Sequence, residues 1–250
     1  MRGEKILELV EITKDYTGTR ALEKVSFDLY GGEILGVASV SGNGVKELVG
    51  ALIHPSRVKG GDVRVKGESI RGLSTLDVFA RGVFFTPEER VQEGILTEGT
   101  IKENVILGHH GEKRFLRHNL FINWEEAAKA TRKTIDEYRV YTPGEDFLIK
   151  RLSGGNIQKV IIGRAFVGPI CLLVTHNPTI GLDISSAEFI FQKLVEVRNH
   201  GDAVLWVNDD LDELMMLSDR IAVMHKGELK GIFLRDQFDK YQIGLAMIGA

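Results

Sequence analysis

Apolar and polar residues alternate near the start of the chain in a pattern that predicts paired strands. Ile6–Ile12 and Val25–Leu29 lie on either side of a turn at Tyr16–Gly18, which is typical of two half-buried antiparallel strands. The nearly continuous apolar run of Glu33–Val40 predicts a buried strand, and Asp62–Val65 is expected to rejoin the first sheet.

The rest of the chain alternates between predicted helices and predicted strands. Helices are expected at Val45–Ile53, at 123–139 with Asn123 as N-cap, from Gly154 or Gly155 onward, at Ser185–Asn199 and at Leu211–Leu217. Strands are expected at Ile170–Val174, Ala203–Val207 and Ile221–Met224. This alternation implies a mainly parallel sheet covered on both faces, so the predicted fold class is α/β. Trp124 is interpreted as a core residue.

Composition narrows the classes of function. The 250 residues are 43% hydrophobic and 27% charged, which argues against disorder. The 32 Lys and Arg against 35 Asp and Glu give a net charge of −3, so no nucleic-acid partner is expected. The single cysteine, Cys171, excludes an internal disulfide framework, and the seven histidines show no metal-ligand spacing, so no metal site is predicted. The apolar runs are far shorter than the ~18 residues that span a bilayer, so a soluble chain is expected.

A glycine turn around Gly44 follows one predicted strand and opens a predicted helix. In this context the backbone N–H groups of a helix N-terminus can cradle phosphate. The phosphate-loop pattern G-x-x-x-x-G-K-[ST] fits loosely, because Ser39 stands at the first glycine and Val45 at the lysine. Lys46 comes one place late, so its ammonium would point away from the phosphate, and Glu47 would repel it. A tight turn without a ligand is the alternative.

The sequence LSGGNIQK, Leu152–Lys159, is more specific. It places a hydroxyl and two glycines at the positive start of a predicted helix, although a serine acting only as N-cap is the alternative. Twelve residues later the chain enters a buried strand, Cys171–Val174, followed by THNPTIGLD at Thr175–Asp183.

This order and spacing resemble the ATPase domains of ABC transporters. With the PEER of Pro87–Arg90 and the stretch Asn208–Leu229, the chain is similar to the second ATPase half of sugar and nucleoside importers, from about residue 6 onward. In that family two halves usually form one chain of about twice this length. The resemblance implies a single ABC ATPase domain over 1–250. It would contain an antiparallel β part at 1–32 and about 60–75, a helical signature-motif subdomain at about 90–152, and an α/β core with a mainly parallel sheet and flanking helices.

The resemblance also assigns candidate site residues. The nucleotide-binding set would be Tyr16, as the aromatic on adenine, with Ser41, Gly42, Asn43, Gly44, Val45, Lys46 and Glu47. A core or surface tyrosine without contact to a nucleotide is the alternative for Tyr16. The signature motif would be Leu152, Ser153, Gly154, Gly155, Asn156 and Gln158, and the D-loop residue would be Asp183. The Q-loop, which couples to the membrane subunit, would be formed by Glu88 and Glu89.

The chain departs from the family where its own ATP would be bound and hydrolysed. Val45 replaces the Walker A lysine, and Lys46 replaces the adjacent serine. His176 replaces the Walker B aspartate, Asn177 the catalytic glutamate, and Asp209 the switch histidine. Because phosphoryl transfer depends on such groups, no residue is predicted to be catalytic in this half, and the isolated chain is expected to be inactive or very weak. ATP and Mg²⁺ are expected in a partner's site and weakly or not at all in its own.

The resemblance therefore implies a nucleotide-binding domain of an ABC importer for nucleosides, sugars or similar small solutes. Its expected partners are a second ABC ATPase half, fused or separate, transmembrane permease subunits and, indirectly, an extracellular solute-binding protein. Its expected location is peripheral, on the cytoplasmic face of the cell membrane. One alternative is a regulatory or structural pseudo-ATPase that binds nucleotide without supporting turnover. Another is a self-sufficient ATPase that uses Lys46 and Asp209 in unusual roles.

Overall fold

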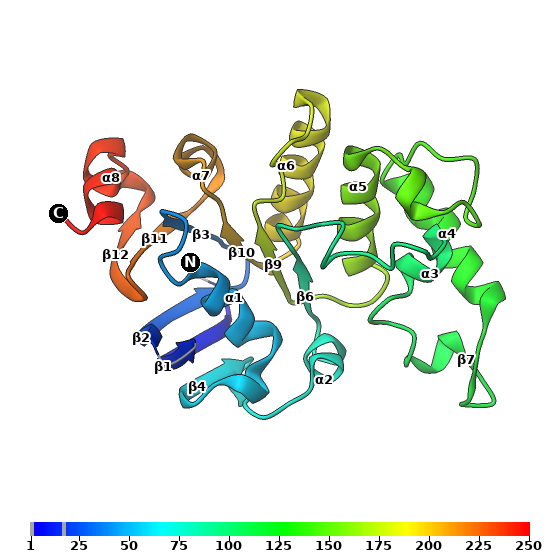
Figure 1. The fold of residues 1–250 in the computed structure, drawn as a ribbon, viewed down its shortest axis with the longest axis horizontal. Coiled ribbons are helices and arrows are strands. Elements are labelled where there is room, and N and C mark those ends of the chain that lie inside the picture. The colour runs from blue at the N-terminus through cyan, green and yellow to red at the C-terminus, as the bar shows by residue number, and fades with distance from the viewer. Residues whose placement is uncertain (1–2, 17–18) are drawn as a thin grey trace. The chain divides into compact units, whose positions relative to one another are not determined.

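Residues 3–16 and 19–250, which the computed structural model describes, are arranged in two units (Figure 1). The first consists of Met1–Val83, Cys171–Asn177 and Phe191–Ala250, and the second of Phe84–Ile170 and Pro178–Ile190.

An antiparallel sheet in the first unit contains β1 (Lys5–Tyr16), β2 (Thr19–Tyr30), β4 (Gly60–Val65) and β5 (Glu68–Ser69), in the order β2-β1-β4-β5. Leu7 of β1 pairs with Leu29 on one side and with Val65 on the other. The predicted antiparallel pair and the return of Asp62–Val65 to the same sheet are therefore confirmed. The predicted turn between the first two strands includes residues 17–18, which lie outside the described residues. Alternation along β1 buries one face, as the period of a strand requires.

The second sheet is mixed. It contains β3 (Ile34–Ser39), β6 (Val83–Thr86), β9 (Leu172–His176), β10 (Ala203–Val207), β11 (Arg220–His225) and β12 (Glu228–Leu234), in the order β12-β11-β3-β10-β9-β6. Strands β11, β3, β10 and β9 are parallel to one another, and β12 is antiparallel to β11. The α/β class is confirmed. Strand β9 ends at His176 rather than at the predicted Val174, because pairing with β10 continues to Val207 and His176.

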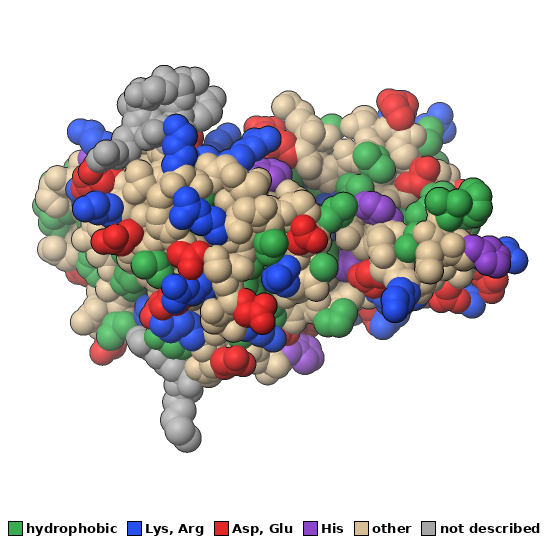
Figure 2. Space-filling model, turned by 90° about the horizontal axis from the view of Figure 1, so that it is seen from below, with side chains coloured by type: hydrophobic (Ala, Val, Ile, Leu, Met, Phe, Trp, Pro, Cys, Tyr) green, Lys and Arg blue, Asp and Glu red, His purple; other side chains and the backbone are tan. Residues whose placement is uncertain are grey.

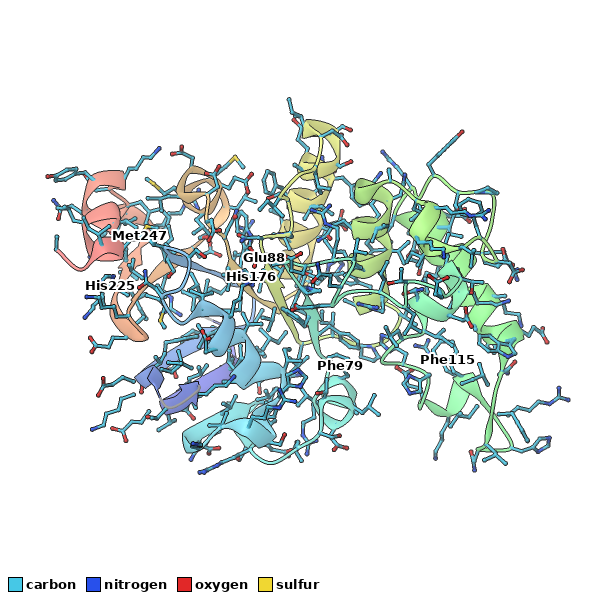
Figure 3. All side chains as sticks on the ribbon, viewed as in Figure 1. Phe79, Glu88, Phe115, His176, His225 and Met247 are labelled. Atoms are coloured by element: carbon cyan, nitrogen blue, oxygen red, sulfur yellow. The ribbon has the colours of Figure 1, made fainter. Side chains whose placement is uncertain are left out.

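Helices of the first unit are α1 (Val45–Ile53), α2 (Thr75–Ala80), α7 (Leu211–Leu217) and α8 (Lys240–Ile248), with short 3₁₀ turns at Pro55–Arg57 and Arg235–Gln237. Helix α6 (Ile184–Asn199) belongs partly to each unit. Helix α7 packs closely on β3, since a Cβ on Gly36 would lie 2.5 Å from Oγ of Ser218. Helix α8, which the sequence did not predict, is fixed by His225, whose Nδ1 lies 3.0 Å from the Met247 carbonyl oxygen (Figure 3).

One ion pair is buried in the first unit. Glu33 and Arg220 are 7% and 8% exposed, and Nη2 of Arg220 donates to Oε2 of Glu33 at 3.0 Å and to the Asp28 carbonyl at 2.7 Å. The Glu33 carboxylate and this carbonyl offset the cost of burying the guanidinium.

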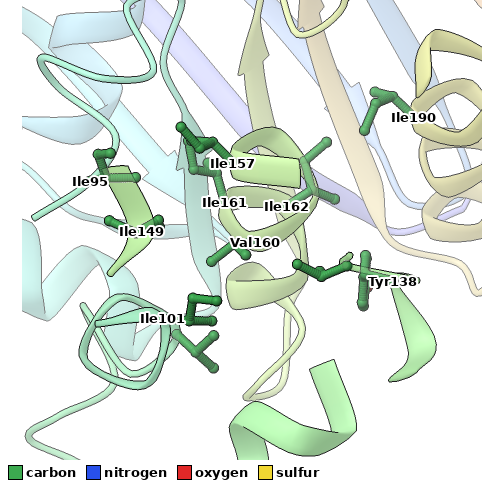
Figure 4. Close-up of a cluster of buried hydrophobic side chains, with 11 residues drawn as sticks. Ile95, Ile101, Tyr138, Ile149, Ile157, Val160, Ile161, Ile162 and Ile190 are labelled. Atoms are coloured by element: carbon green, nitrogen blue, oxygen red, sulfur yellow. The ribbon is translucent and has the colours of Figure 1, made fainter. Parts of the chain in front are cut away.

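The second unit is largely helical, with α3 (Ile101–Val105), α4 (Trp124–Glu137), α5 (Gly154–Ala165), a small hairpin of β7 (Leu116–Arg117) and β8 (Phe121–Ile122), and 3₁₀ turns at Lys113–Phe115 and Ile149–Arg151. Its core surrounds α5 (Figure 4), where Ile157, Val160 and Ile161 pack with Ile101 and Tyr138.

Two predictions about α4 have different outcomes. Asn123 caps the helix, as predicted, by accepting the Glu126 N–H. The prediction that Trp124 is a core residue is wrong, since this side chain is 46% exposed and its ring lies beneath the Lys102 ammonium, 5.6 Å from Nζ to the ring centroid. Trp124 is the first residue of the helix, and the buried positions of α4 begin one turn later, at Ala127.

Positive and negative side chains are interspersed on the face drawn in Figure 2, in agreement with the near balance of charge. Among the helices of residues 3–16 and 19–250, none combines the length and the apolar character needed to cross a bilayer.

Candidate functional site

The turn between β3 and α1 holds most of the predicted nucleotide-binding residues. Ser41, Gly42 and Lys46 are exposed, whereas Val45 is buried, with 8% of its surface accessible. The α1 N-cap is Gly44, in the left-handed region with φ of 94°, and no side chain caps the helix. The residue at the Walker A lysine position is therefore an apolar side chain turned into the protein.

The β11–β12 hairpin holds the same turn in place. Oδ1 of Asn43 accepts the Lys226 N–H at 2.9 Å, and the Asn43 carbonyl accepts the Gly227 N–H at 3.0 Å. A Cβ on Gly44 would lie 2.7 Å from the Ala21 carbonyl oxygen and 3.0 Å from Cα of Gly227. Contacts within the protein thus account for the conformation of this turn and for the need for glycine at position 44.

A lysine that the sequence analysis did not consider lies near α1. Nζ of Lys14 is 3.5 Å from the Glu47 carbonyl oxygen, and burial lowers the pKa of Lys14. Its ammonium lies beside the helix near Gly50, 2.9 Å from where a Cβ there would be, rather than at the N-terminal turn.

The ends of β9 and β10 bring together the next set of predicted residues. His176 and Asn177 are buried, at 7% and 2% exposure, and Asn177 has a φ of 45°. Nδ2 of Asn177 donates to Oδ2 of Asp209 at 3.1 Å, and the Asp209 N–H donates to Oδ1 of Asn177 at 2.9 Å. Strands β3, β10 and β9 are parallel neighbours, so the glycine turn, Asn177 and Asp209 follow strand ends at one edge of the sheet. Within the described ranges, no group of three or more His, Cys, Asp or Glu side chains could hold a metal ion.

The predicted signature residues form the start of α5 in the second unit. Ser153 is the N-cap, and its Oγ accepts from the Asn156 N–H at 3.4 Å and from the Asn156 Nδ2 at 2.9 Å. Oδ1 of Asn156 in turn accepts the Tyr141 N–H. Ser153 and Gly154 are exposed, Leu152 packs against the core, and Gln158 is buried at 1% exposure.

The residue predicted for the D-loop, Asp183, lies near this helix start. A Cβ on Gly155 would be 2.7 Å from Oγ of Ser186 and 3.8 Å from Oδ2 of Asp183. The Asp183 carboxylate accepts from both Ser185 and Ser186 hydroxyls and from the Ser186 N–H. These donors hold the pKa of Asp183 well below its usual range, so the carboxylate stays ionised.

The predicted Q-loop lies in the turn after β6. Glu88 is half-buried (labelled in Figure 3) and Glu89 is exposed. The following residue, Arg90, is the last residue of the PEER motif, and the sequence predicted no role for it. Its guanidinium reaches the Ile180 carbonyl and lies beside Gly154. The side chain of Tyr16, the predicted adenine-stacking residue, lies outside the described residues.

Comparison with known proteins identifies the family. The ABC transporter family model matches residues 22–180. The chain belongs to the ABC transporter family of ATP-binding proteins, whose members in general bind ATP with Mg²⁺.

Several import proteins are similar over almost the whole chain. The nucleoside import ATP-binding protein NupA of Lactococcus lactis is 33% identical over 245 residues, which are 98% of this chain and 48% of NupA. The guanosine import ATP-binding protein NupO of Bacillus subtilis is 35% identical over 249 residues, 99% of this chain and 49% of NupO. The arabinose import ATP-binding protein AraG of Pectobacterium atrosepticum is 31% identical, over 94% of this chain and 46% of AraG. The chain therefore spans about half the length of these relatives.

Solved structures support the same fold. A nucleotide-free ATP-binding cassette from an ABC transporter superposes with a TM-score of 0.79 at 21% identity, covering 98% of this chain and 100% of that one. The ADP conformation of an ATP-binding cassette of an ABC transporter, MJ1267, gives a TM-score of 0.76 at 20% identity, covering 98% of this chain and 99% of that one.

Proposed function

We propose that this chain is the nucleotide-binding half of an ABC importer that completes the ATP site of a partner half while its own ATP site is degenerate. The observation that carries the proposal is the start of α5. Ser153 and Gly154 are exposed at the positive end of a 12-residue helix whose first turn contains no acidic side chain. Such an end attracts a phosphate group.

The chain's own site does not fit a magnesium-bound triphosphate. Val45 is buried and supplies no charge, and the Asp209 carboxylate is engaged with Asn177. Magnesium prefers hard oxygen ligands, so His176 is a poor replacement for an aspartate. An amide at Asn177 cannot accept a proton from water. These features support weak or absent binding of ATP and Mg²⁺ at this site and no turnover by the isolated chain.

In the partner's site, the Ser153 hydroxyl and the N–H groups of Gly154 and Gly155 would contact the γ-phosphate of ATP held by the partner's Walker motifs. ATP supplies the free energy of the transport cycle when it is bound and hydrolysed there. This chain's contribution is to bind and orient that phosphate. Asp183, ionised and ordered by Ser185 and Ser186, would lie at the same contact between halves.

The names of the relatives support the proposed class of transported solute and the proposed location at a membrane. The solute would be a nucleoside, a sugar or a similar small molecule. The partners would be a second ABC ATPase half, fused or separate, and transmembrane permease subunits, with a solute-binding protein acting indirectly from outside the cell. The chain would then lie peripherally on the cytoplasmic face of the membrane, and Glu88 and Glu89, with the helical second unit, would transmit its movements to the permease. All of 1–250 would form one ABC ATPase domain.

The test is an S153D substitution in the assembled pair of halves. Aspartate is a good N-cap, so α5 keeps its start, whereas the added carboxylate repels a γ-phosphate. We expect ATP turnover to fall at least about tenfold, since 1.4 kcal/mol of repulsion is enough for that factor. S56D, at an exposed serine of the 3₁₀ turn Pro55–Arg57, adds the same carboxylate away from the signature motif and should leave turnover unchanged.

Wild-type turnover by the S153D assembly would contradict the proposal and favour a structural or regulatory pseudo-ATPase. Calorimetric titration of ATP into the isolated chain provides the second readout. Tight, magnesium-dependent binding with phosphate release would instead favour a self-sufficient site.

A further inference from the structure

Arg90 links three segments of the second unit that are far apart in the sequence. Nη2 of its guanidinium donates to the carbonyl oxygen of Ile180, at the turn that leads to Asp183. Nη1 lies 3.2 Å from where a Cβ on Gly154 would stand, and Nη2 lies 4.0 Å from the same position on Gly181. The guanidinium therefore fills the space between the start of α5 and the D-loop turn.

The turn that carries Arg90 is itself held against α5. The Arg90 carbonyl accepts the Gly94 N–H at 3.1 Å, and a Cβ on Gly94 would lie 2.8 Å from Cδ1 of Ile161 and 3.1 Å from Cγ of Pro87. Gly94 thus lets the turn lie directly on the side of the helix. The backbone of Arg90 is therefore held against α5, and its side chain extends from there to the beginning of that helix.

The two glycines of the signature motif have different neighbours. Gly154 lies against the Arg90 guanidinium, and Gly155 lies against Ser186 and Asp183. The N-terminus of α5 is therefore held between the Pro87–Gly94 turn and the D-loop. Arginine suits this place because its planar fork can direct donors to more than one neighbour, which a lysine ammonium does less well.

We propose that Arg90 is a positioning residue for the signature motif: it fixes the start of α5 against the D-loop turn so that both meet the partner half in one arrangement. This inference rests on the proposed function. The guanidinium also adds positive charge at a helix end that has no acidic side chain in its first turn, which raises the potential there for an approaching phosphate.

The test measures ATP turnover by the assembled halves carrying R90A or R90K. R90A is expected to lower kcat about ten- to hundredfold, because misplacement of binding groups by about 1 Å costs up to this factor. The KM for ATP should change much less, because the partner half supplies most of the contacts to the nucleotide. R90K keeps the charge but not the fork and should fall between R90A and wild type. Free guanidinium ion, added below the concentrations that unfold the protein, should restore part of the R90A rate.

R117A, which removes an exposed arginine from the β7–β8 hairpin of the same unit, is the matched control and should retain the wild-type rate. Thermal unfolding of each variant separates positioning from folding. A loss of turnover in R90A that follows loss of folded protein, with no guanidinium rescue, would overturn the inference.

Comparison with S153D distinguishes the two proposals. If S153D abolishes turnover while R90A and R90K keep the wild-type rate, Arg90 has no positioning role and the proposed function stands. If S153D and R90A both turn over ATP at the wild-type rate, the proposed function and this inference fail together.

Discussion

Asn177 and Asp209 bind each other through two hydrogen bonds of opposite direction, one from side chain to side chain and one from backbone to side chain. The pair links the residue after β9 to the second residue after β10, so the two strand ends are tied where both parallel strands stop. The amide fits this arrangement because its nitrogen donates while its oxygen accepts, which a carboxylate cannot do. In the family pattern these two positions hold a glutamate and a histidine, which could form one such bond but not both with these roles.

We therefore predict that N177E destabilises the protein rather than restoring an active site. The carboxylate cannot donate to Asp209 and repels it, and the positive φ of 45° suits asparagine better than glutamate. The free energy of unfolding should fall by about 1–3 kcal/mol, measured by urea unfolding. Adding D209H should recover part of the loss by placing a donor opposite the new carboxylate. An N177E protein as stable as wild type would show that the pair is not a structural link.

Two glycines of one turn should respond differently to alanine. In G42A the new Cβ meets nothing within 4 Å, so only the φ of 87° opposes it, at a cost of about 1 kcal/mol. In G44A the Cβ also lies 2.7 Å from a carbonyl oxygen and 3.0 Å from a backbone Cα. We expect G44A to lower the melting temperature several times more than G42A, as measured by calorimetry. Equal shifts would mean that the turn relaxes freely away from the β11–β12 hairpin.

The buried pair of Glu33 and Arg220 predicts a large difference between single and double variants. E33A leaves a guanidinium with 8% exposure beside a single carbonyl acceptor from Asp28, which should cost about 3–5 kcal/mol. The double variant E33L/R220M removes both charges and should lose much less. Denaturant unfolding of wild type and the two variants checks the order. A double variant less stable than E33A would show that the ion pair contributes net attraction.

Asp183 predicts a stability that depends on pH in acid. Its pKa is depressed by three donors, so its contribution is present above the unfolded pKa of about 3.9 and is lost as pH falls through the lower folded value. D183N should therefore melt below wild type from pH 5 to 8, and the difference should shrink as pH drops below about 4. D136N, on the exposed side of α4, serves as the control and should melt with wild type throughout. A difference that is constant down to the lowest pH would contradict the assignment.

Elements with strong periodicity or a continuous apolar run could be predicted from the sequence. Val45–Ile53, Ala203–Val207 and Leu211–Leu217 have the predicted bounds, because burial on one face or on both fixes their pattern. The last two elements, β12 and α8, were not predicted. Most of β12 is only half-buried, and α8 presents Tyr241 and Ile248 to the surface, so neither has a clear pattern.

Two short helices that were not predicted have capping motifs in the sequence from which their first residues could have been predicted. Helices α2 and α3 begin with capping boxes, Ser74 with Asp77 and Thr100 with Glu103, although they are only six and five residues long. The placement of Arg90 left no such signal. Its neighbours at Gly154 and Ile180 are 64 and 90 positions away along the chain, and only the tertiary fold brings them to it.

The close approach at Gly44 bears on how such chains change over evolutionary time. Selection for a folded protein alone would keep this glycine, because Ala21 and Gly227 leave no room for a side chain. A lysine that served only to bind phosphate is not kept by packing in this way once the phosphate is no longer bound. A glycine-rich turn can thus persist in a sequence after phosphate binding has been lost. Its presence therefore indicates that the fold is retained, and it does not by itself indicate that phosphate is bound.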